Sequence, residues 1–406
     1  MNGLSNTPMF NPFLPSYKQN PYMQFSKIRD IAPIQYSEAL QSWVVFNYKY
    51  SKEILLDNKV FSSSIQSASG QIADLVKSQQ MQSPIGFVET VINSDEPTHT
   101  RLRSLVHRAF LPKKIELLKE YVESIVDEIL QEAINNKQIE IMNDFAQPVP
   151  IKVIAKMLGV PGSDYKIFKD WSDNIIQAAT NILPNQEIIE RGNQSIKELI
   201  EYFNKQIKIR KNGMITTDIL SELIVAEEDG SILSDKELIA FIILLLVAGN
   251  ETTTNFIGNG IASLLNDDKA IDAILNDKTN TSDVIEELFR INSPVIGVAR
   301  FANRKYLMNE YEISKGDAVL IMIGSANHDP VVFQNPNEII FNREFNSHLS
   351  FGHGIHYCLG ASLARMESAV MLKKILPLIK KSSQTNEIVF DSTFFLRWPK
   401  KIDIRI

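Results

Sequence analysis

The stretch of sequence that decides the fold is Phe351-Gly-His-Gly-Ile-His-Tyr-Cys358-Leu-Gly360. It holds the single cysteine of the chain, Cys358, and three glycines surround that thiol. Glycine permits positive φ angles and lets another group approach the backbone closely. Apolar residues then recur at helical spacing from Leu359 to Val370, so the thiol lies at the N-terminus of a helix. Free N–H groups and the helix dipole stabilise a thiolate there, as a metal ligand requires.

Two other interpretations of Cys358 stay open on these residues alone. A lone cysteine is most often a small buried hydrophobic residue. His353 and His356 lie close by in the sequence, so a cysteine–histidine nucleophile of a hydrolase is the second alternative. However, no Asn or Asp stands out as the third member of such a catalytic group.

The pattern Phe-x-x-Gly-x-x-x-Cys-x-Gly resembles the haem-ligand loop of the cytochrome P450 family. The resemblance extends from about Pro33 to the C-terminus. It implies that Cys358 is the axial ligand of the iron in haem b, and that Phe351, His356 and Gly360 bind the cofactor. The implied fold is mainly α-helical with small β-sheets, and it holds the haem between a long central helix and the cysteine loop.

A second motif, Glu287-Leu-Phe-Arg290, lies on the N-terminal side of the cysteine. Side chains three residues apart on a helix can pair, although such a pair is usually a surface salt bridge of small energy. The resemblance implies that Glu287 and Arg290 meet Arg343, which precedes the cysteine loop. Their implied role is structural, because together they lock that loop to the core.

The longest predicted helix begins at a Ser-x-x-Glu capping box, Ser234 to Glu237, and continues to about residue 265. Its middle reads Ala248-Gly-Asn-Glu-Thr-Thr-Thr254, which places an acid inside an apolar helix. A helix kink with back-bonded threonine hydroxyls is the simpler explanation. The resemblance implies instead that Ala248 and Gly249 adjoin the haem, and that Glu251 and Thr252 are catalytic. Glu251 would relay protons, and Thr252 would hydrogen-bond the oxygen.

The resemblance also implies partners for the two haem propionates. In Glu96-Pro-Thr-His99-Thr-Arg101-Leu-Arg103, the cationic residues His99 and Arg103 are four apart and share one helical face. Arg300 and His356 match the other two contacts. Buried carboxylates need cationic or hydrogen-bonding partners, which these four side chains supply.

The implied substrate pocket is apolar, so we expect an apolar or amphipathic small molecule as substrate. Its lining by resemblance is Phe87, Leu244, Val247, Ala248, Val295, Ile296, Val298, Phe394 and Phe395. Two departures from the family pattern lie elsewhere. His328 stands where arginine is common, and Arg397 is followed by tryptophan rather than glycine.

Composition narrows the class of protein further. The 406 residues carry a formal net charge of -6, which argues against a nucleic-acid partner. One cysteine excludes an internal disulfide, an iron–sulfur cluster and a tetracysteine zinc site. The N-terminus lacks a signal peptide, and the most apolar run, residues 238–248, is too short to span a bilayer. We expect a single cytoplasmic domain over residues 1–406, with about 15 N-terminal residues forming a loose arm and no contact with membranes.

The periodicity of apolar residues predicts the remaining elements. Residues 62–95 read as loop, and Pro148 and Pro150 break the chain before a helix over 151–158. Further helices are predicted over residues 115–134 and within 171–211, and strands over 43–46, 298–301, 306–313 and 318–323.

The resemblance implies a monooxygenase that inserts one oxygen atom of O2 into a small organic substrate, in a role we assign to secondary metabolism. The sequence has no dinucleotide fingerprint, so the electrons come from an external ferredoxin or flavodoxin and its reductase. A partner-binding basic patch is predicted at Arg101, Arg108, Lys113 and Lys114. Three alternatives remain: a haem-thiolate peroxygenase or isomerase that needs no reductase, a non-enzymatic haem protein, and the cysteine hydrolase.

Overall fold

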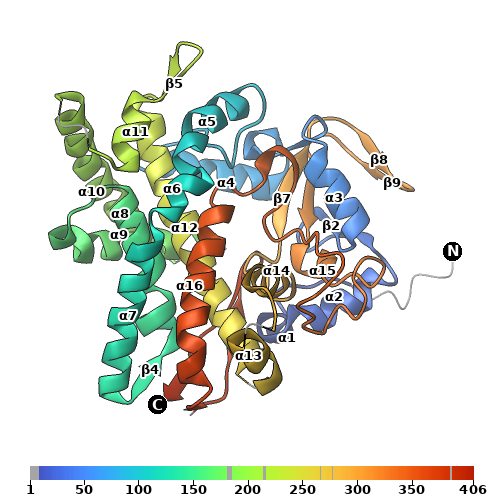
Figure 1. Ribbon diagram of the computed structural model, residues 1–406. Helices are drawn as coiled ribbons and strands as arrows, with labels where there is room; N and C mark the ends of the chain where they lie inside the picture. The colour runs from blue at the N-terminus through green and yellow to red at the C-terminus, as the bar shows by residue number, and fades with distance from the viewer. Residues whose placement is uncertain (1–8, 181–184, 214–215, 266, 277, 385) are drawn as a thin grey trace. The chain divides into compact units, whose positions relative to one another are not determined.

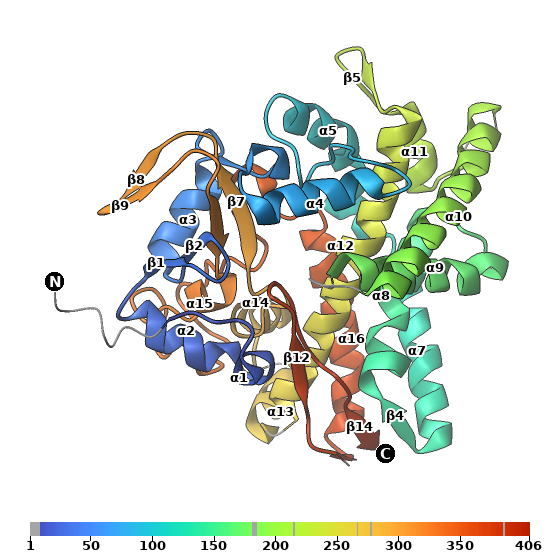
Figure 2. The same ribbon diagram turned by 180° about the vertical axis from the view of Figure 1, so that it is seen from behind.

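The computed structural model describes residues 9–180, 185–213, 216–265, 267–276, 278–384 and 386–406 (Figures 1 and 2). The chain divides into two compact units. The first consists of Met1–Val76, Asn255–Cys358 and Ile375–Ile406, and the second of Lys77–Thr254 and Leu359–Lys374. Most elements are helices, with small sheets beside them, as the sequence predicts.

The first unit is built on a five-stranded sheet with the order β1-β2-β10-β7-β3. β2 and β10 are parallel, and the other neighbours are antiparallel. The strands are β1 (Ile34–Ser37), β2 (Ser42–Val45), β3 (Phe61–Ser62), β7 (Val298–Ala302) and β10 (Ala318–Ile321). Three smaller pairings are β8 (Tyr306–Met308) with β9 (Tyr311–Ile313), β11 (Ser383–Gln384) with β14 (Asp403–Arg405), and β12 (Phe390–Ser392) with β13 (Arg397–Pro399).

The helices of the first unit are short. They are α1 (Pro15–Gln19), α2 (Pro21–Arg29), α3 (Tyr48–Leu56), α13 (Asp268–Leu275), α14 (Thr281–Ile291) and α15 (Ile323–Ala326), with 3-10 turns η1 (Ile65–Ser67) and η5 (Gly354–His356). The strands over 43–46 and 298–323 agree with the prediction to within two residues, because their β-branched and aromatic residues face a buried core.

The N-terminal arm is not loose from residue 10 onward, which corrects the prediction. The Phe10 side chain is 2% exposed and packs in a core cluster with Tyr17 and Phe394. The Phe10 N–H also donates to Gln35 Oε1 at 3.0 Å. Phe10 and Tyr17 therefore anchor this segment in the core, which composition alone did not indicate. Residues 1–8 of the predicted arm lie outside the described residues.

The second unit is helical. It contains α5 (Thr98–His107), α6 (Pro112–Glu116), α7 (Lys119–Asn136), α8 (Pro148–Met157), α9 (Tyr165–Thr180), α10 (Gln186–Lys211) and α11 (Ile219–Val225). Shorter pieces are η2 (Arg108–Phe110), β4 (Gln138–Glu140), the π-turn η3 (Ile141–Ala146), η4 (Gly162–Asp164), β5 (Glu227–Glu228) and β6 (Ser231–Ile232).

Three helices contain residues of both units: α4 (Gln71–Gln82), α12 (Asp235–Leu264) and α16 (Ala361–Ile379). α4 contradicts the loop predicted over 62–95, because flanking serines and glycines concealed a 12-residue helix. Pro148 also does not break the chain. It opens α8 instead. The N–H groups of the first turn of a helix have no acceptor within the helix, so proline, which lacks an N–H, is tolerated there.

Helix α12 begins as the capping box predicts. The Glu237 N–H donates to Ser234 Oγ at 3.2 Å, and Glu237 Oε2 accepts the Ser234 N–H at 2.8 Å. Within the described part of the chain, α12 is the one helix long and apolar enough to cross a membrane, by length and composition. Half of that apolar window is buried, and the core helix of a soluble protein has the same length and composition.

Candidate active site

The cysteine loop lies in the first unit and folds back on its own backbone. The Cys358 N–H donates to the Phe351 carbonyl at 2.8 Å, and the Tyr357 N–H donates to the Gly354 carbonyl at 3.1 Å. Cys358 itself is half-buried. The loop therefore presents its thiol from a closed turn, and α16 begins three residues later at Ala361.

Two glycines give this loop its shape. Gly352 has a φ of +73° and Gly354 a φ of +74°, in the left-handed region that favours glycine. A Cβ on Gly354 would lie 2.6 Å from the carbonyl oxygen of Leu55, near the end of α3. The close backbone approach that the sequence predicted is thus made to α3, and a side chain at Gly354 would push the loop away.

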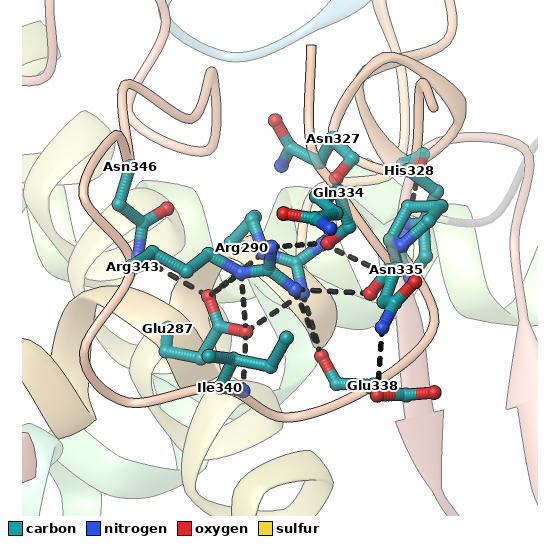
Figure 3. A network of polar contacts seen from close by, with 12 residues as sticks. Glu287, Arg290, Asn327, His328, Gln334, Asn335, Glu338, Ile340, Arg343 and Asn346 are labelled. Atoms are coloured by element: carbon teal, nitrogen blue, oxygen red, sulfur yellow. Dashed lines mark hydrogen bonds and ion pairs between the residues drawn. The ribbon is translucent and has the colours of Figure 1, made fainter. Parts of the chain in front are cut away.

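The Glu287 carboxylate is the centre of a buried polar network beside the loop (Figure 3). Glu287 and Arg290 on α14 are both 0% exposed. Arg290 donates from Nε to Glu287 Oε2 and from Nη2 to Glu287 Oε1, both at 2.8 Å. Arg343 Nε donates to the same two oxygens at 3.0 and 2.9 Å. The predicted triad therefore exists, and its carboxylate is shared by two guanidinium groups.

Backbone carbonyls satisfy the remaining donors of the two arginines (Figure 3). Arg290 Nη1 donates to the carbonyls of Asn327 and Pro336 at 2.9 and 2.7 Å. Arg343 Nη2 donates to the carbonyls of Asn335 and Glu338 at 3.0 and 3.1 Å. These bonds tie the segment before the cysteine loop to α14.

Asn327 and Ser350 also hold the loop, and the sequence interpretation did not assign them a role. Asn327 Oδ1 accepts the Leu349 N–H at 2.8 Å, and its Nδ2 donates to Ser350 Oγ at 2.8 Å. Ser350 Oγ in turn donates to the Phe289 carbonyl at 2.6 Å. The fully buried side chain of Asn327 is visible only in the structure, since asparagine in sequence usually indicates a turn.

His328 replaces the arginine that is common at its position, and it is neutral. Its ring is 6% exposed and lies 4.7 Å, centroid to centroid, from the Tyr22 ring. Burial, with the charges of Arg290 and Arg29 nearby, lowers the pKa of His328 to about 3. A neutral ring here avoids adding one more buried cation beside these arginines.

The central motif of α12 packs within the second unit. Thr252 Oγ1 donates to the Ala248 carbonyl at 2.6 Å, which is the back-bonding of the simpler interpretation. A Cβ on Gly249 would meet Ile154 Cδ1 of α8 at 2.6 Å, so the glycine has a packing reason in addition to the implied one. Glu251 is half-buried on the same helix.

His99 and Arg103 lie on α5, one turn apart, as predicted. The His99 side chain is buried, and its burial together with the Arg103 charge lowers the pKa of its ring. Arg101, between them in sequence, forms an ion pair with Glu237 at the start of α12. In the first unit, Arg300 extends from β7 and donates to the Ala299 carbonyl at 2.8 Å.

The predicted pocket residues separate into two groups. Ile296 and Phe394 are 0% and 6% exposed and belong to the core cluster that contains Phe10. Side chains so enclosed fill the core rather than line a pocket, which corrects the prediction for these two. The others keep accessible surface and stay predictions: Phe87, Leu244, Val247, Ala248, Val295, Val298 and Phe395.

The side chains present fit the cofactor that the resemblance implies. Haem b needs one axial donor for its iron and cationic or hydrogen-bonding partners for two propionates. Cys358 supplies a sulfur from a loop that Gly354 keeps closed against α3. Arg103 and Arg300, each with accessible surface, supply guanidinium donors. In the described part of the chain, no group of three His, Cys, Asp or Glu could hold a metal ion by itself.

Comparison with known proteins of similar sequence and fold shows the family to which this chain belongs. The family model described as Cytochrome P450 matches residues 36–405. The polyketide biosynthesis cytochrome P450 PksS of Bacillus subtilis is 34% identical over 409 residues, covering 98% of each chain. A solved structure of PksS aligns with a TM-score of 0.88 at 33% identity, over 98% of this chain and 99% of that chain.

Two further relatives agree. The cytochrome P450 monooxygenase PikC of Streptomyces venezuelae is 30% identical over 399 residues, covering 96% of this chain and 92% of PikC. The crystal structure of CYP109E1 from Bacillus megaterium in complex with testosterone aligns with a TM-score of 0.83 at 33% identity, over 95% of this chain and 99% of that chain. The chain therefore belongs to the cytochrome P450 family and is a P450 monooxygenase whose cofactor is haem b.

Proposed function

We propose that this protein inserts one oxygen atom of O2 into a C–H or C=C bond of an apolar or amphipathic small molecule, with electrons from separate redox proteins. The observation that carries the proposal is the closed Phe351–Cys358 loop, locked to α14 by the buried network around Glu287. Such a network holds a single thiol in one place, which a metal ligand needs and a buried hydrophobic cysteine does not.

Cys358 is the proposed axial ligand. When bound, the haem supplies the redox chemistry of oxygen activation, to which a thiolate ligand contributes electron density. The backbone N–H of Cys358 is already used by Phe351, so donors that stabilise the sulfur come from the residues that follow it into α16. Phe351, His356 and Gly360 of this loop are proposed to contact the cofactor.

Glu251 and Thr252 are the proposed catalytic residues. The Thr252 hydroxyl has one proton, which it now donates to the Ala248 carbonyl. To donate to an oxygen atom of the substrate O2, the hydroxyl must rotate away from Ala248, and Glu251 one residue earlier must supply the proton that follows. Ala248 and Gly249 are proposed to adjoin the haem on the same helix.

The propionates of the haem are proposed to bind His99, Arg103, Arg300 and His356. Burial and the Arg103 charge lower the pKa of His99, and its ring can donate a hydrogen bond to a propionate while the arginines carry positive charge. Neutralising two carboxylates with guanidinium groups makes the buried cofactor less costly to hold.

The substrate proposal rests on accessible apolar residues and on the relatives. Phe87, Leu244 and Val295 keep apolar surface in their units. PksS is named for polyketide biosynthesis, and CYP109E1 was solved in complex with testosterone. We propose an apolar or amphipathic substrate, a role in secondary metabolism and a cytoplasmic location.

An external ferredoxin or flavodoxin with its reductase is the proposed electron donor. Of the predicted basic patch, Arg101 and Lys114 are already paired with Glu237 and Glu222. Lys113 is exposed and is the residue we assign to the partner surface. Reversing the charge by Lys113→Glu should slow the first electron transfer, whereas an unchanged rate would remove this residue from the surface.

Product formation with labelled O2 tests the proposed reaction. With a ferredoxin and its reductase, the wild type should place one labelled oxygen atom in the product. Thr252→Ala should consume O2 while product per O2 falls by about tenfold or more, since an aligned proton donor contributes at least that much. Thr252→Ser keeps the hydroxyl and should restore the yield. Faster turnover with peroxide than with the redox partner would favour the peroxygenase alternative instead.

A further inference from the structure

His348, three residues before Phe351, faces polar groups with both ring nitrogens. Its Nδ1 accepts the Ser350 N–H at 3.2 Å, and its Nε2 lies 3.3 Å from Glu286 Oε2. The His348 side chain is 3% exposed, whereas that of Glu286 is 24% exposed. Because Nδ1 accepts a hydrogen bond, the proton of the neutral ring lies on Nε2, on the side of the carboxylate.

The contact at Nδ1 leads directly to the cysteine. Ser350, whose N–H it accepts, is fixed at its hydroxyl by the Phe289 carbonyl and by Asn327 Nδ2. The next residue, Phe351, accepts the Cys358 N–H through its carbonyl at 2.8 Å. The imidazole ring thus holds the peptide between residues 349 and 350, two peptide units before the one whose Phe351 carbonyl closes the cysteine turn.

The contact at Nε2 joins the loop to α14 at a second point. Glu287 holds this segment through Arg343, five residues before His348. Glu286, its neighbour on α14, faces His348 itself. The ring of His348 also lies 6.4 Å from that of Phe289, at an interplanar angle of 26°. Two adjacent carboxylates therefore fix the segment on both sides of residues 344–347.

We propose that His348 is a positioning residue for the Cys358 thiolate. By accepting the Ser350 N–H while facing Glu286, it fixes the start of the cysteine turn, so that the sulfur keeps the place from which it binds iron. This inference rests on the proposed ligand role of Cys358. It assigns His348 no contact with the substrate or the cofactor.

Two substitutions test the two ring nitrogens of His348 one at a time. His348→Asn keeps an oxygen acceptor at the position of Nδ1, and His348→Gln keeps an N–H donor at that of Nε2 but loses the acceptor. We expect His348→Gln to raise amide hydrogen exchange at Ser350 and Cys358 by about tenfold, the effect of one lost buried hydrogen bond. His348→Asn should stay near the wild-type rate. His353→Gln, in the same loop, is the matched control and should change neither amide.

A spectroscopic measurement gives an independent signal. In reduced protein with carbon monoxide, His348→Gln should lower the fraction with the red-shifted Soret band of thiolate ligation, and His348→Asn should recover it. Equal exchange rates and spectra in the two variants, with lowered thermal stability alone, would reduce His348 to a packing residue and overturn the proposal.

If His348→Gln does not fold, Glu286→Leu provides the second variant, because Glu286 is partly exposed. Its loss removes the acceptor that faces Nε2 of His348 and should raise exchange at Ser350 by about threefold, the size of a weak polar contact, and an unchanged rate would overturn the proposal. A wild type without the red-shifted band would mean that the ligand role of Cys358 has failed. The exchange rates would then still decide the role of His348 in the loop.

Discussion

Glu287 and Glu367 are both buried carboxylates, and their surroundings give them opposite properties. Glu287 is 0% exposed and accepts hydrogen bonds from Arg290, Arg343 and the Ile340 N–H, so its charge is compensated. Glu367 on α16 is 1% exposed, and its Oε1 has no hydrogen-bond partner in the part of the chain described. Burial raises the pKa of Glu367 to about 8, so this side chain is a neutral acid at pH 7.

Removing the charge of Glu287 should destabilise the protein strongly. Glu287→Gln leaves Arg290 and Arg343 as buried cations without a carboxylate, which costs roughly 3–5 kcal/mol. Urea unfolding of the variant measures this loss. Glu338→Gln is the matched control, because its side chain is exposed and its carbonyl, which accepts from both arginines, is retained. Equal stability of the two variants would show that the network does not hold the loop.

Glu367 should make stability fall as pH rises. Between the ordinary pKa of 4.5 and the raised pKa of about 8, the folded state keeps a proton that the unfolded state releases. The free energy of unfolding then falls by about 1.4 kcal/mol per pH unit over this window and levels off above it. Glu367→Gln should remove that slope and be more stable than the wild type at pH 8. Glu132→Gln, on an exposed face of α7, should keep the slope, and a wild type without it would contradict a neutral Glu367.

At the scale of elements, the start of α12 is the clearest case of local sequence directing structure. Ser234 and Glu237 exchange hydrogen bonds as a capping box, and Arg101 of α5 pairs with the same glutamate. The box therefore caps the start of α12, and through Glu237 it connects that helix to α5, which carries His99 and Arg103. A weaker cap should loosen both helices together.

Ser234→Ala should lower the free energy of unfolding by about 1 kcal/mol, the usual value of a lost serine cap. It should also raise hydrogen exchange in the first turn of α12, since Glu237 loses one of its anchors. Ser124→Ala, at an exposed position within α7, is the control and should be neutral or slightly stabilising. Identical effects of both substitutions would mean that the capping box adds nothing to α12.

The sequence predicts those elements whose signal is local. The capping box, the strands β2, β7 and β10 and the Glu287–Arg290 pair each depend on neighbours within a few residues or on the family pattern, whereas β1 and β3 of the same sheet were not predicted. Helix α4 was missed because its flanks are rich in serine, glycine and proline, which usually indicate turns. The roles of Phe10 and Asn327 depend on partners far away in the sequence, which no local pattern contains.

At the scale of the whole molecule, the chain uses one thiol for its chemistry and many polar residues to hold it. Cys358 is the single cysteine of 406 residues, so any thiolate-ligated haem in this protein must use it. The loop carrying it is joined to α14 through Arg343, Ser350 and His348, none of which is itself a ligand. The family membership fixes haem b as the cofactor, and Cys358 as the ligand of its iron is the central claim.

The most direct test is the visible spectrum of the dithionite-reduced protein with carbon monoxide, for the wild type and for Cys358→Ala. Thiolate ligation predicts a strongly red-shifted Soret band in the wild type and its loss in the variant, while folding is confirmed by circular dichroism. A Soret band that is the same with and without Cys358 would contradict the assignment of the ligand and with it the proposed role of the loop.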